Sequence, residues 1–229
     1  GDDLATFSIC ERPMKPEPFT VGCDNYLDGV ALLLYSDTIN QRGDWATGVL
    51  PPENSRPYDL EFVLAAPADY LPEVRSSLTL FVDHQDPERA LPERCFQLLA
   101  PTGIPKGAFD VWAEKAMESM IDIVRFTGPV CSDFADIVSA LNAGGGRAVT
   151  AAWVDCECTE QELLSKLRQL RLRPLLCHVI GGPEVIPMSR FTRIWDALET
   201  AFPGAEEAVL GYGVHPNKRT TLFFLGVPI

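Results

Sequence analysis

The last third of the chain constrains the fold most, because helix-like and strand-like segments alternate there regularly. TEQELLSKLRQLRL, from residue 159, places leucines at helical spacing behind a capping-box pair, Thr159 and Glu162. PLLCHVIGG has the length and apolar density of a buried strand, and SRFTRIWDALETAF is a second amphipathic helix with Ser189 as its expected N-cap. EEAVLGYGVHPNKRTTLFFLGV predicts two strands joined as a hairpin by HPNK. The pattern predicts an α/β layer in which helices cover a sheet.

Two helices are predicted ahead of this layer. Between Lys106 and Phe126 the apolar residues keep helical spacing, which predicts one long helix with a buried face. A shorter helix follows in DFADIVSAL and ends at three glycines, 144–146, ahead of the strand-like RAVTAAWVD. Glycines that follow a helix and precede a strand favour a helix end and turn over an anion-binding nest.

The first 105 residues carry three strand-like runs, GVALLLYS, YDLEFVLAA and SSLTLFVD, separated by connections rich in proline and glycine. Residues 1–20 contain three prolines and predict an arm on the surface. We therefore divide the chain into an N-terminal part (1–105), a central helix (106–128) and a C-terminal domain (129–229).

Charge and cysteine content exclude several classes of partner. The 19 basic and 32 acidic residues give a formal charge of -13, which repels nucleic acid and anionic membrane surfaces. The longest apolar run, Val30 to Tyr35, is far shorter than the roughly 20 residues of a membrane-spanning helix. Seven irregularly spaced cysteines predict a reducing compartment and thus a cytoplasmic location.

Three stretches resemble the FtsZ/tubulin family over about residues 77–229. AFDVWAEKAMESMIDIVRFTGPVCSDFADIVSAL is similar to the family's central helix and synergy loop, whose motif is N-x-D-F-A-D. PLLCHVIGG and the segment from RFTRIWDALETAF to the end are similar to the later strands and closing helix of the family's C-terminal domain. YLDGVALLLYSDTINQ is faintly similar to the family's second strand, but the phosphate-binding motif G-G-G-T-G-[ST]-G occurs nowhere. The resemblance implies an α/β fold with an FtsZ/tubulin C-terminal-like sheet covered by helices, preceded by a long central helix and a shortened N-terminal α/β part.

The resemblance also implies roles for the loop before the second helix. In the family, one subunit binds GTP and the next inserts two synergy-loop carboxylates that orient the attacking water. Asp133 and Asp136 match these carboxylates, and Cys131 replaces the asparagine of the motif. The alternative is purely structural: Ser132 caps the helix, and both aspartates favour the positive end of its dipole. We expect Asp133 and Asp136 to be catalytic only if a partner supplies the nucleotide.

The candidate interface residues are Cys131, Phe134 and Trp45. The first two belong to the same loop, and Trp45 lies in a connection rich in proline and glycine, where it is either a local anchor or an interface contact.

No metal site is expected. Cys156 and Cys158 are too close together and too isolated for zinc. Cys177 and His178 are adjacent on a strand, so they point to opposite faces and cannot act as a nucleophile and base.

These observations favour a non-catalytic protein that binds no cofactor and acts by self-assembly or by docking onto an FtsZ-type filament protein. One alternative is a protein that binds GTP or stimulates GTP hydrolysis, through the synergy-loop carboxylates or a phosphate site at Gly181 and Gly182. Another is a soluble interaction module with no link to cell division.

Overall fold

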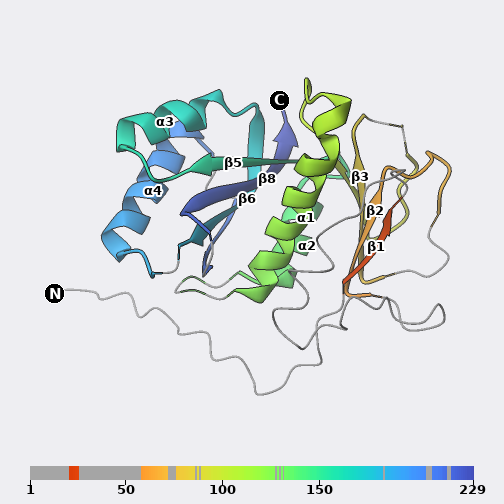
Figure 1. Ribbon diagram of the computed structural model, residues 1–229, viewed down its shortest axis with the longest axis horizontal. Helices are drawn as coiled ribbons and strands as arrows, with labels where there is room; N and C mark the ends of the chain where they lie inside the picture. The colour runs from red at the N-terminus through yellow and green to blue at the C-terminus, as the bar shows by residue number, and fades with distance from the viewer. Residues whose placement is uncertain are drawn as a thin grey trace, which may run out of the picture.

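Two four-stranded sheets surround a central pair of helices (Figure 1). The computed structural model describes residues 21–25, 58–71, 76–85, 87, 89–126, 128, 130, 132–182, 184–204, 208–215 and 218–229. The first sheet is parallel and follows chain order: β1 (Val21–Asn25), β2 (Leu60–Leu64), β3 (Leu78–Asp83) and β4 (Cys95–Leu99).

The second sheet is mixed and has the strand order β5-β8-β6-β7. Its strands are β5 (Thr150–Asp155), β6 (Leu172–Gly181), β7 (Val209–Val214) and β8 (Thr221–Pro228). β6 and β7 run parallel, whereas β8 is antiparallel to both of its neighbours. This architecture is the α/β class predicted from the sequence.

Four α-helices cover the sheets: α1 (Phe109–Arg125), α2 (Phe134–Ala143), α3 (Glu160–Gln169) and α4 (Met188–Ala201). Figure 1 shows α1 and α2 between the two sheets, with α3 and α4 on the outer flank of the second sheet. The residues of β6 follow this division. Leu176 and Ile180 belong to the core shared with α1 and α2, while Cys177 and Val179 belong to the core under α3 and α4.

The central helix α1 belongs to the core of both sheets. Its buried side chains pack with residues of β2 and β3 on one side and of β5 and β8 on the other. The sheets also meet directly, because the Val149 N–H donates to the Gln97 carbonyl (2.9 Å) and the Leu99 N–H donates to the Val149 carbonyl (2.7 Å). The N-terminal and C-terminal parts therefore share one hydrophobic core.

Several local predictions are confirmed. The predicted long helix is α1, the capping box of Thr159 and Glu162 begins α3, and glycines 144–146 form the turn after α2. YDLEFVLAA and SSLTLFVD contain β2 and β3. The strand predicted in GVALLLYS and the arm predicted in residues 1–20 lie outside the described residues. β1 and β4 were not predicted.

The predicted hairpin is wrong. β7 and β8 do not pair with each other, because they lie on opposite sides of β6. The burial of the strands explains this order. Leu222 through Leu225 are almost fully buried on both faces of β8, which suits a position inside the sheet, whereas β7 is only partly buried and lies at its edge.

The predicted N-cap of α4 is also wrong. α4 begins at Met188 with Pro187 at the N-cap, so Ser189 lies inside the first turn. Proline suits a helix start, where a backbone N–H is not needed.

Among the described helices, none combines the length and apolar character required to cross a membrane.

Candidate functional site

The connection between α1 and α2 is held against the edge strand β7. The Tyr212 N–H donates to the Val130 carbonyl at 2.8 Å, an isolated antiparallel bridge. Glycines make this approach possible: a Cβ at Gly213 would lie 2.7 Å from the Phe126 carbonyl oxygen, and a Cβ at Gly211 would collide with the Ser132 hydroxyl. The glycines of β7 thus position the N-terminus of α2.

Asp133 and Asp136 cap α2 reciprocally. Asp133 Oδ1 accepts hydrogen bonds from the Ala135 and Asp136 N–H groups at 2.8 and 3.2 Å, and Asp136 Oδ2 accepts from the Asp133 N–H at 2.9 Å. Asp133 is therefore the N-cap, which corrects the structural alternative that assigned this role to Ser132. Within the described residues the second oxygen of each carboxylate has no hydrogen-bond partner, so each remains able to accept a hydrogen bond from water or from another molecule.

Ser132 is buried and faces His178 instead. Its Oγ lies 3.4 Å from His178 Nδ1, and burial lowers the pKa of His178 to about 3. The neutral ring is therefore part of the packing beneath β7. Cys177 packs on the other side of the sheet, as the strand alternation predicted.

The predicted interface residues are placed only in part. Phe134 is half-buried and packs against the core that contains α1, so part of its surface is used internally. Cys131 and Trp45 lie outside the described residues.

A buried acid on α1 forms a second polar cluster, which sequence reasoning missed. Lys218 Nζ lies 2.5 Å from Asp122 Oδ2 and 3.1 Å from Glu118 Oε2. His215 Nε2 lies 3.8 Å from the same Asp122 oxygen, and its ring packs against Phe126 at 4.3 Å between centroids. The cluster ties the crossover between β7 and β8 to the central helix. The only sequence signal was an acid inside a helix whose neighbouring residues are apolar.

Burial controls the protonation of this cluster. Burial raises the pKa of Asp122 from 3.8 to about 6, against the opposing effect of the Lys218 ammonium. Burial, helped by the same ammonium, lowers the pKa of His215 to about 4. The cluster therefore holds a carboxyl group that titrates near neutral pH.

Arginine covers the carboxyl ends of β2 and β3, part of the sheet edge at which open parallel sheets commonly bind ligands. The Arg89 guanidinium donates to both oxygens of Asp83, at 2.8 and 2.9 Å. It also donates to the carbonyl oxygens of Ala66 and Pro67, which follow β2, and it covers the Phe81 ring at 4.6 Å. The backbone after β2 thus presents carbonyl groups to an internal cation, whereas a phosphate site needs converging N–H groups.

The glycines at the end of β6, Gly181 and Gly182, also contact another part of the chain. The Gly181 carbonyl accepts a hydrogen bond from the His215 N–H at 3.1 Å, and a Cβ at Gly182 would lie 3.4 Å from the Lys218 carbonyl oxygen. The alternative phosphate site at Gly181 and Gly182 is therefore covered by the crossover between β7 and β8.

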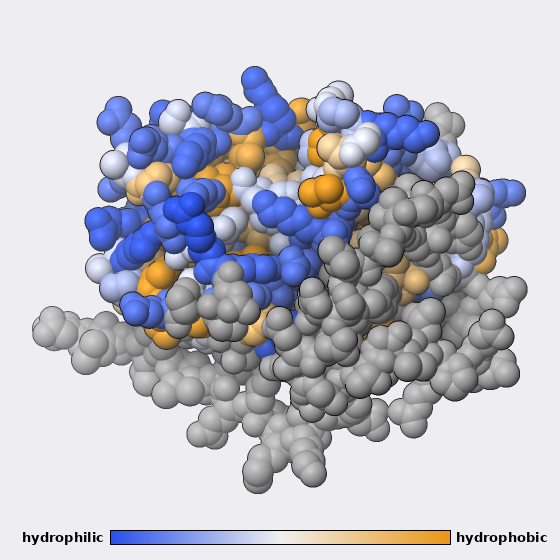
Figure 2. Space-filling view, viewed as in Figure 1, coloured by the Kyte–Doolittle hydropathy of each residue, from blue (hydrophilic) through white to orange (hydrophobic). Residues whose placement is uncertain are grey.

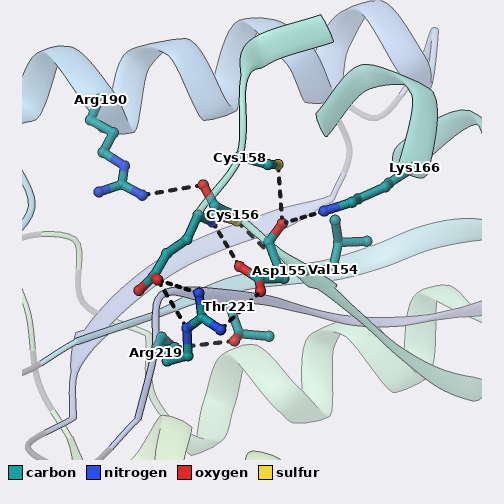
Figure 3. A network of polar contacts seen from close by, with 9 residues as sticks. Val154, Asp155, Cys156, Cys158, Lys166, Arg190, Arg219 and Thr221 are labelled. Atoms are coloured by element: carbon teal, nitrogen blue, oxygen red, sulfur yellow. Dashed lines mark hydrogen bonds and ion pairs between the residues drawn. The ribbon is translucent and has the colours of Figure 1, made fainter. Parts of the chain in front are cut away.

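A shallow hollow of about 480 Å³ lies between the start of α3 and α4, beside Cys156 and Cys158. Figure 3 shows the polar contacts next to it. Burial raises the pKa of Cys156 to about 12, so its thiol stays protonated. Arg219 pairs with Glu157 at 2.6 Å. No group of three or more potential metal ligands occurs in the described part of the chain.

No protein-family model matches the sequence, and none of the curated proteins does. Among solved structures, the chain is similar to a tryptophan-to-tyrosine mutant of FtsZ from M. jannaschii, with a TM-score of 0.47, 12% identity, and coverage of 73% of this chain and 64% of that one. It is also similar to CetZ2 from Haloferax volcanii in a GTPγS-bound protofilament, with a TM-score of 0.43, 14% identity, and coverage of 73% and 64%.

A third similar structure is TubZ of Bacillus thuringiensis serovar israelensis in GDP-form protofilaments, with a TM-score of 0.43, 9% identity, and coverage of 74% and 64%. The chain spans less than two thirds of the length of each protein. The likeness concerns the fold alone.

Proposed function

We propose that this chain is a non-catalytic protein of FtsZ/tubulin-like fold that acts in the cytoplasm by self-association, or by docking onto a filament-forming partner of the same fold. In this proposal residues 1–105 are a shortened, degenerate nucleotide domain. Residues 106–128 are the central helix, and residues 129–229 are the domain that presents the contact surface.

The closed end of the first sheet is the observation that carries the non-catalytic assignment. The Arg89 side chain is only 2% exposed and is bound to Asp83 and to backbone carbonyls. A phosphate at this position would have to displace a bidentate ion pair and would then meet carbonyl oxygens, which repel it. This arrangement supports association over nucleotide hydrolysis.

Nucleotide binding is the first test. We expect the melting temperature of the purified chain to stay constant on addition of millimolar GTP or GDP with Mg²⁺, because a ligand stabilises only a state that binds it. Phosphate release should equal that of buffer. A rise of several degrees together with phosphate release would overturn the non-catalytic assignment.

Association is the second test. Sedimentation velocity over a range of concentrations should show species larger than the monomer, either alone or with an added filament protein of this fold. A chain that stays monomeric and does not bind such a filament would contradict the proposal. It would favour the alternative of a soluble interaction module with no link to cell division.

A second candidate function is stimulation of a partner's GTP hydrolysis. It is supported by the carboxylate oxygens of Asp133 and Asp136 that have no hydrogen-bond partner in the described part of the chain. Asp133→Asn with Asp136→Asn should remove any stimulation, because a neutral amide orients water less strongly than a carboxylate does. The matched control is Asp196→Asn with Glu199→Gln, two exposed acids on α4. Equal stimulation by both variants would exclude this role.

A further inference from the structure

The connection from β5 to α3 places two free cysteines at the hollow between α3 and α4. Cys156 is buried, and its thiol donates to the Val154 carbonyl at 3.6 Å. Cys158 is only half-buried, and its thiol donates to the Asp155 carbonyl at 3.4 Å, as Figure 3 shows. The pair thus presents one accessible sulfur, that of Cys158, at the wall of a small cavity.

The hollow has the size and lining of a site for a small molecule. Its volume of about 480 Å³ lies within the range of about 300–1,000 Å³ that is usual for such sites. Leu163 of α3 and Ile194 of α4 give it an apolar wall, and charged side chains line the rest. Figure 2 shows the same mixture on this flank of the molecule, where hydrophobic side chains lie between hydrophilic ones.

Two cations and one anion at the hollow have no partner side chain in the described part of the chain. Arg190 reaches from α4 and donates to the Cys156 carbonyl at 3.2 Å (Figure 3). Arg193 donates to the Ser189 carbonyl of its own helix at 3.3 Å. Glu160, the first residue of α3, is exposed and makes no ion pair or hydrogen bond with another described side chain. The hollow therefore offers two guanidinium groups and one carboxylate to a ligand.

The other two acids that line the hollow are already bound within the protein. Arg219 pairs with Glu157 at 2.6 Å. Glu162 accepts hydrogen bonds from the Thr159 N–H at 2.9 Å and from the Thr159 hydroxyl at 2.8 Å, as part of the capping box of α3. These contacts leave Arg190, Arg193 and Glu160 as the charges that a ligand can pair with directly.

We propose that Cys158 is a site of reversible S-thiolation, at which a small acidic thiol peptide of the glutathione type is held in this hollow as a mixed disulfide. Such a peptide carries two carboxylates and one ammonium group, which complement Arg190, Arg193 and Glu160. Guanidinium groups suit carboxylates because they donate two parallel hydrogen bonds to them. This site is independent of the proposed self-association.

The chemical step is a thiol–disulfide exchange with a low-molecular-weight disulfide. The Cys158 thiolate attacks one sulfur of the disulfide, so a new Sγ–S bond forms as the original S–S bond breaks. The leaving thiolate takes up the proton that the Cys158 thiol released. One disulfide is consumed and one is formed, so the exchange needs no other oxidant. A free thiol of the same class reverses it by the same route.

Cys156 is a poor group for displacing the bound peptide. Burial raises the pKa of its thiol to about 12, and only the thiolate form attacks a disulfide. We therefore expect the mixed disulfide at Cys158 to accumulate, and not an intrachain disulfide between the two cysteines.

Two small disulfides distinguish charge recognition from simple exposure of the thiol. The reduced full chain is incubated with oxidised glutathione or with hydroxyethyl disulfide, which carries no charge. Mass spectrometry, with fragmentation of the peptide that holds both Cys156 and Cys158, gives the rate at which each disulfide modifies Cys158. An absent glutathione adduct at Cys158, or an intrachain disulfide formed in its place, would overturn the proposed site.

The test variant is Arg190→Gln with Arg193→Gln. Its rate of modification by oxidised glutathione should fall about fivefold, because two exposed ion pairs with the peptide are lost. The control, Arg168→Gln with Arg171→Gln, makes the same change in net charge at exposed arginines outside the hollow and should keep the wild-type rate.

The rate with hydroxyethyl disulfide should be the same in wild type, test variant and control, which also reports an intact fold around Cys158. Arg193→Gln alone leaves the Arg190 contact in place and should slow the glutathione reaction about twofold. Equal rates of the glutathione reaction in wild type and both Arg193 variants, or an equal loss with both disulfides, would overturn recognition by the arginines.

Discussion

Asp83 and Asp122 are both buried carboxylates, but they differ in the groups that donate hydrogen bonds to them. Asp83, at the end of β3, receives two hydrogen bonds from Arg89 and a third from Gln97 at 3.0 Å. Asp122, on α1, receives the Lys218 ammonium on one oxygen, while its other oxygen has no hydrogen-bond partner within the described residues.

The difference lies in the cation that each buried carboxylate receives. A planar guanidinium matches both oxygens of a carboxylate, whereas an ammonium is a point charge that binds mainly one. Desolvation then prevails at Asp122 and raises its pKa to about 6. We expect Arg89 to hold Asp83 by its geometry, and we expect the stability contributed by Asp122 to depend on pH.

Removal of Arg89 should have the largest effect. Arg89→Met leaves Asp83 buried without its counter-ion and removes the Arg89 donor from the Ala66 carbonyl, which should lower the free energy of unfolding by about 3–5 kcal/mol. Urea denaturation monitored by circular dichroism measures this change. Arg94→Met, at an exposed site, is the control with an expected change near zero. A loss below about 1 kcal/mol would show that the guanidinium is dispensable, and the comparison with Asp122 would fail.

The pH dependence of stability should show the next largest effect, at Asp122. The raised pKa of Asp122 means that its favourable contribution is present below pH 3.8 and is lost as pH rises through about 6. This loss amounts to at most about 3 kcal/mol. The free energy of unfolding of Asp122→Asn should therefore rise relative to wild type between pH 4 and pH 7.

The histidines act with the opposite sign. The pKa values of His178 and His215 are lowered to about 3 and about 4, so their contribution is present above pH 6.5 and is lost as pH falls. Both residues occur in wild type and variant, so subtracting the two curves largely removes their effect. If the free energies of unfolding of wild type and Asp122→Asn changed with pH in parallel, the assignment of the titrating group to Asp122 would be contradicted.

Replacement of Lys218 should have a smaller effect that depends on pH. Lys218→Met removes the counter-ion of Asp122, which should cost about 1–2 kcal/mol at pH 8 and much less at pH 5, where the carboxyl group takes up a proton. Lys166→Met is the control, since Lys166 makes only one long contact, to the Asp155 carbonyl at 3.4 Å. Thermal denaturation at both pH values measures the loss of stability. Equal losses at pH 5 and pH 8 would argue against protonation of Asp122 in this range.

The smallest effect should come from Gln97. Gln97→Leu removes the hydrogen bond from the Gln97 amide to the Asp83 carboxylate and leaves both Arg89 hydrogen bonds in place, so we expect a loss of about 1 kcal/mol by urea denaturation. A loss as large as that of Arg89→Met would show that Asp83 depends on the whole network and not on the guanidinium.

Local features of the fold could be predicted because they depend on residues a few positions apart. The apolar spacing of α1, the capping box of α3 and the glycine turn after α2 each involve neighbours within about four residues along the chain. Asp133 and Asp136 were found in the same way. The N-cap considered from the sequence was Ser132, one residue before the observed N-cap, Asp133. Serine and aspartate are both good caps, and only the burial of Ser132 against His178 distinguishes them.

The order of β7 and β8 could not be predicted by local reasoning. HPNK indicates that the chain reverses, but it does not say whether the next strand pairs beside β7 or crosses to the far side of β6. The buried residues of β8 require a neighbour on each side, and β5 and β6 supply both. Pairing between residues 41 to 76 positions apart decides such an order, and periodicity within one strand carries no information about it.

The sequence by itself determined the helices, most of the strands, the absence of the glycine-rich phosphate motif and the two aspartates at the start of α2. Only the tertiary structure decided that Arg89 covers the ends of β2 and β3 and that Asp122 meets Lys218 96 residues away. The physical reason is the distance along the chain between the residues that interact. Helix and turn preferences act between near neighbours, whereas burial and ion pairing depend on which distant segments the shared core around α1 brings together.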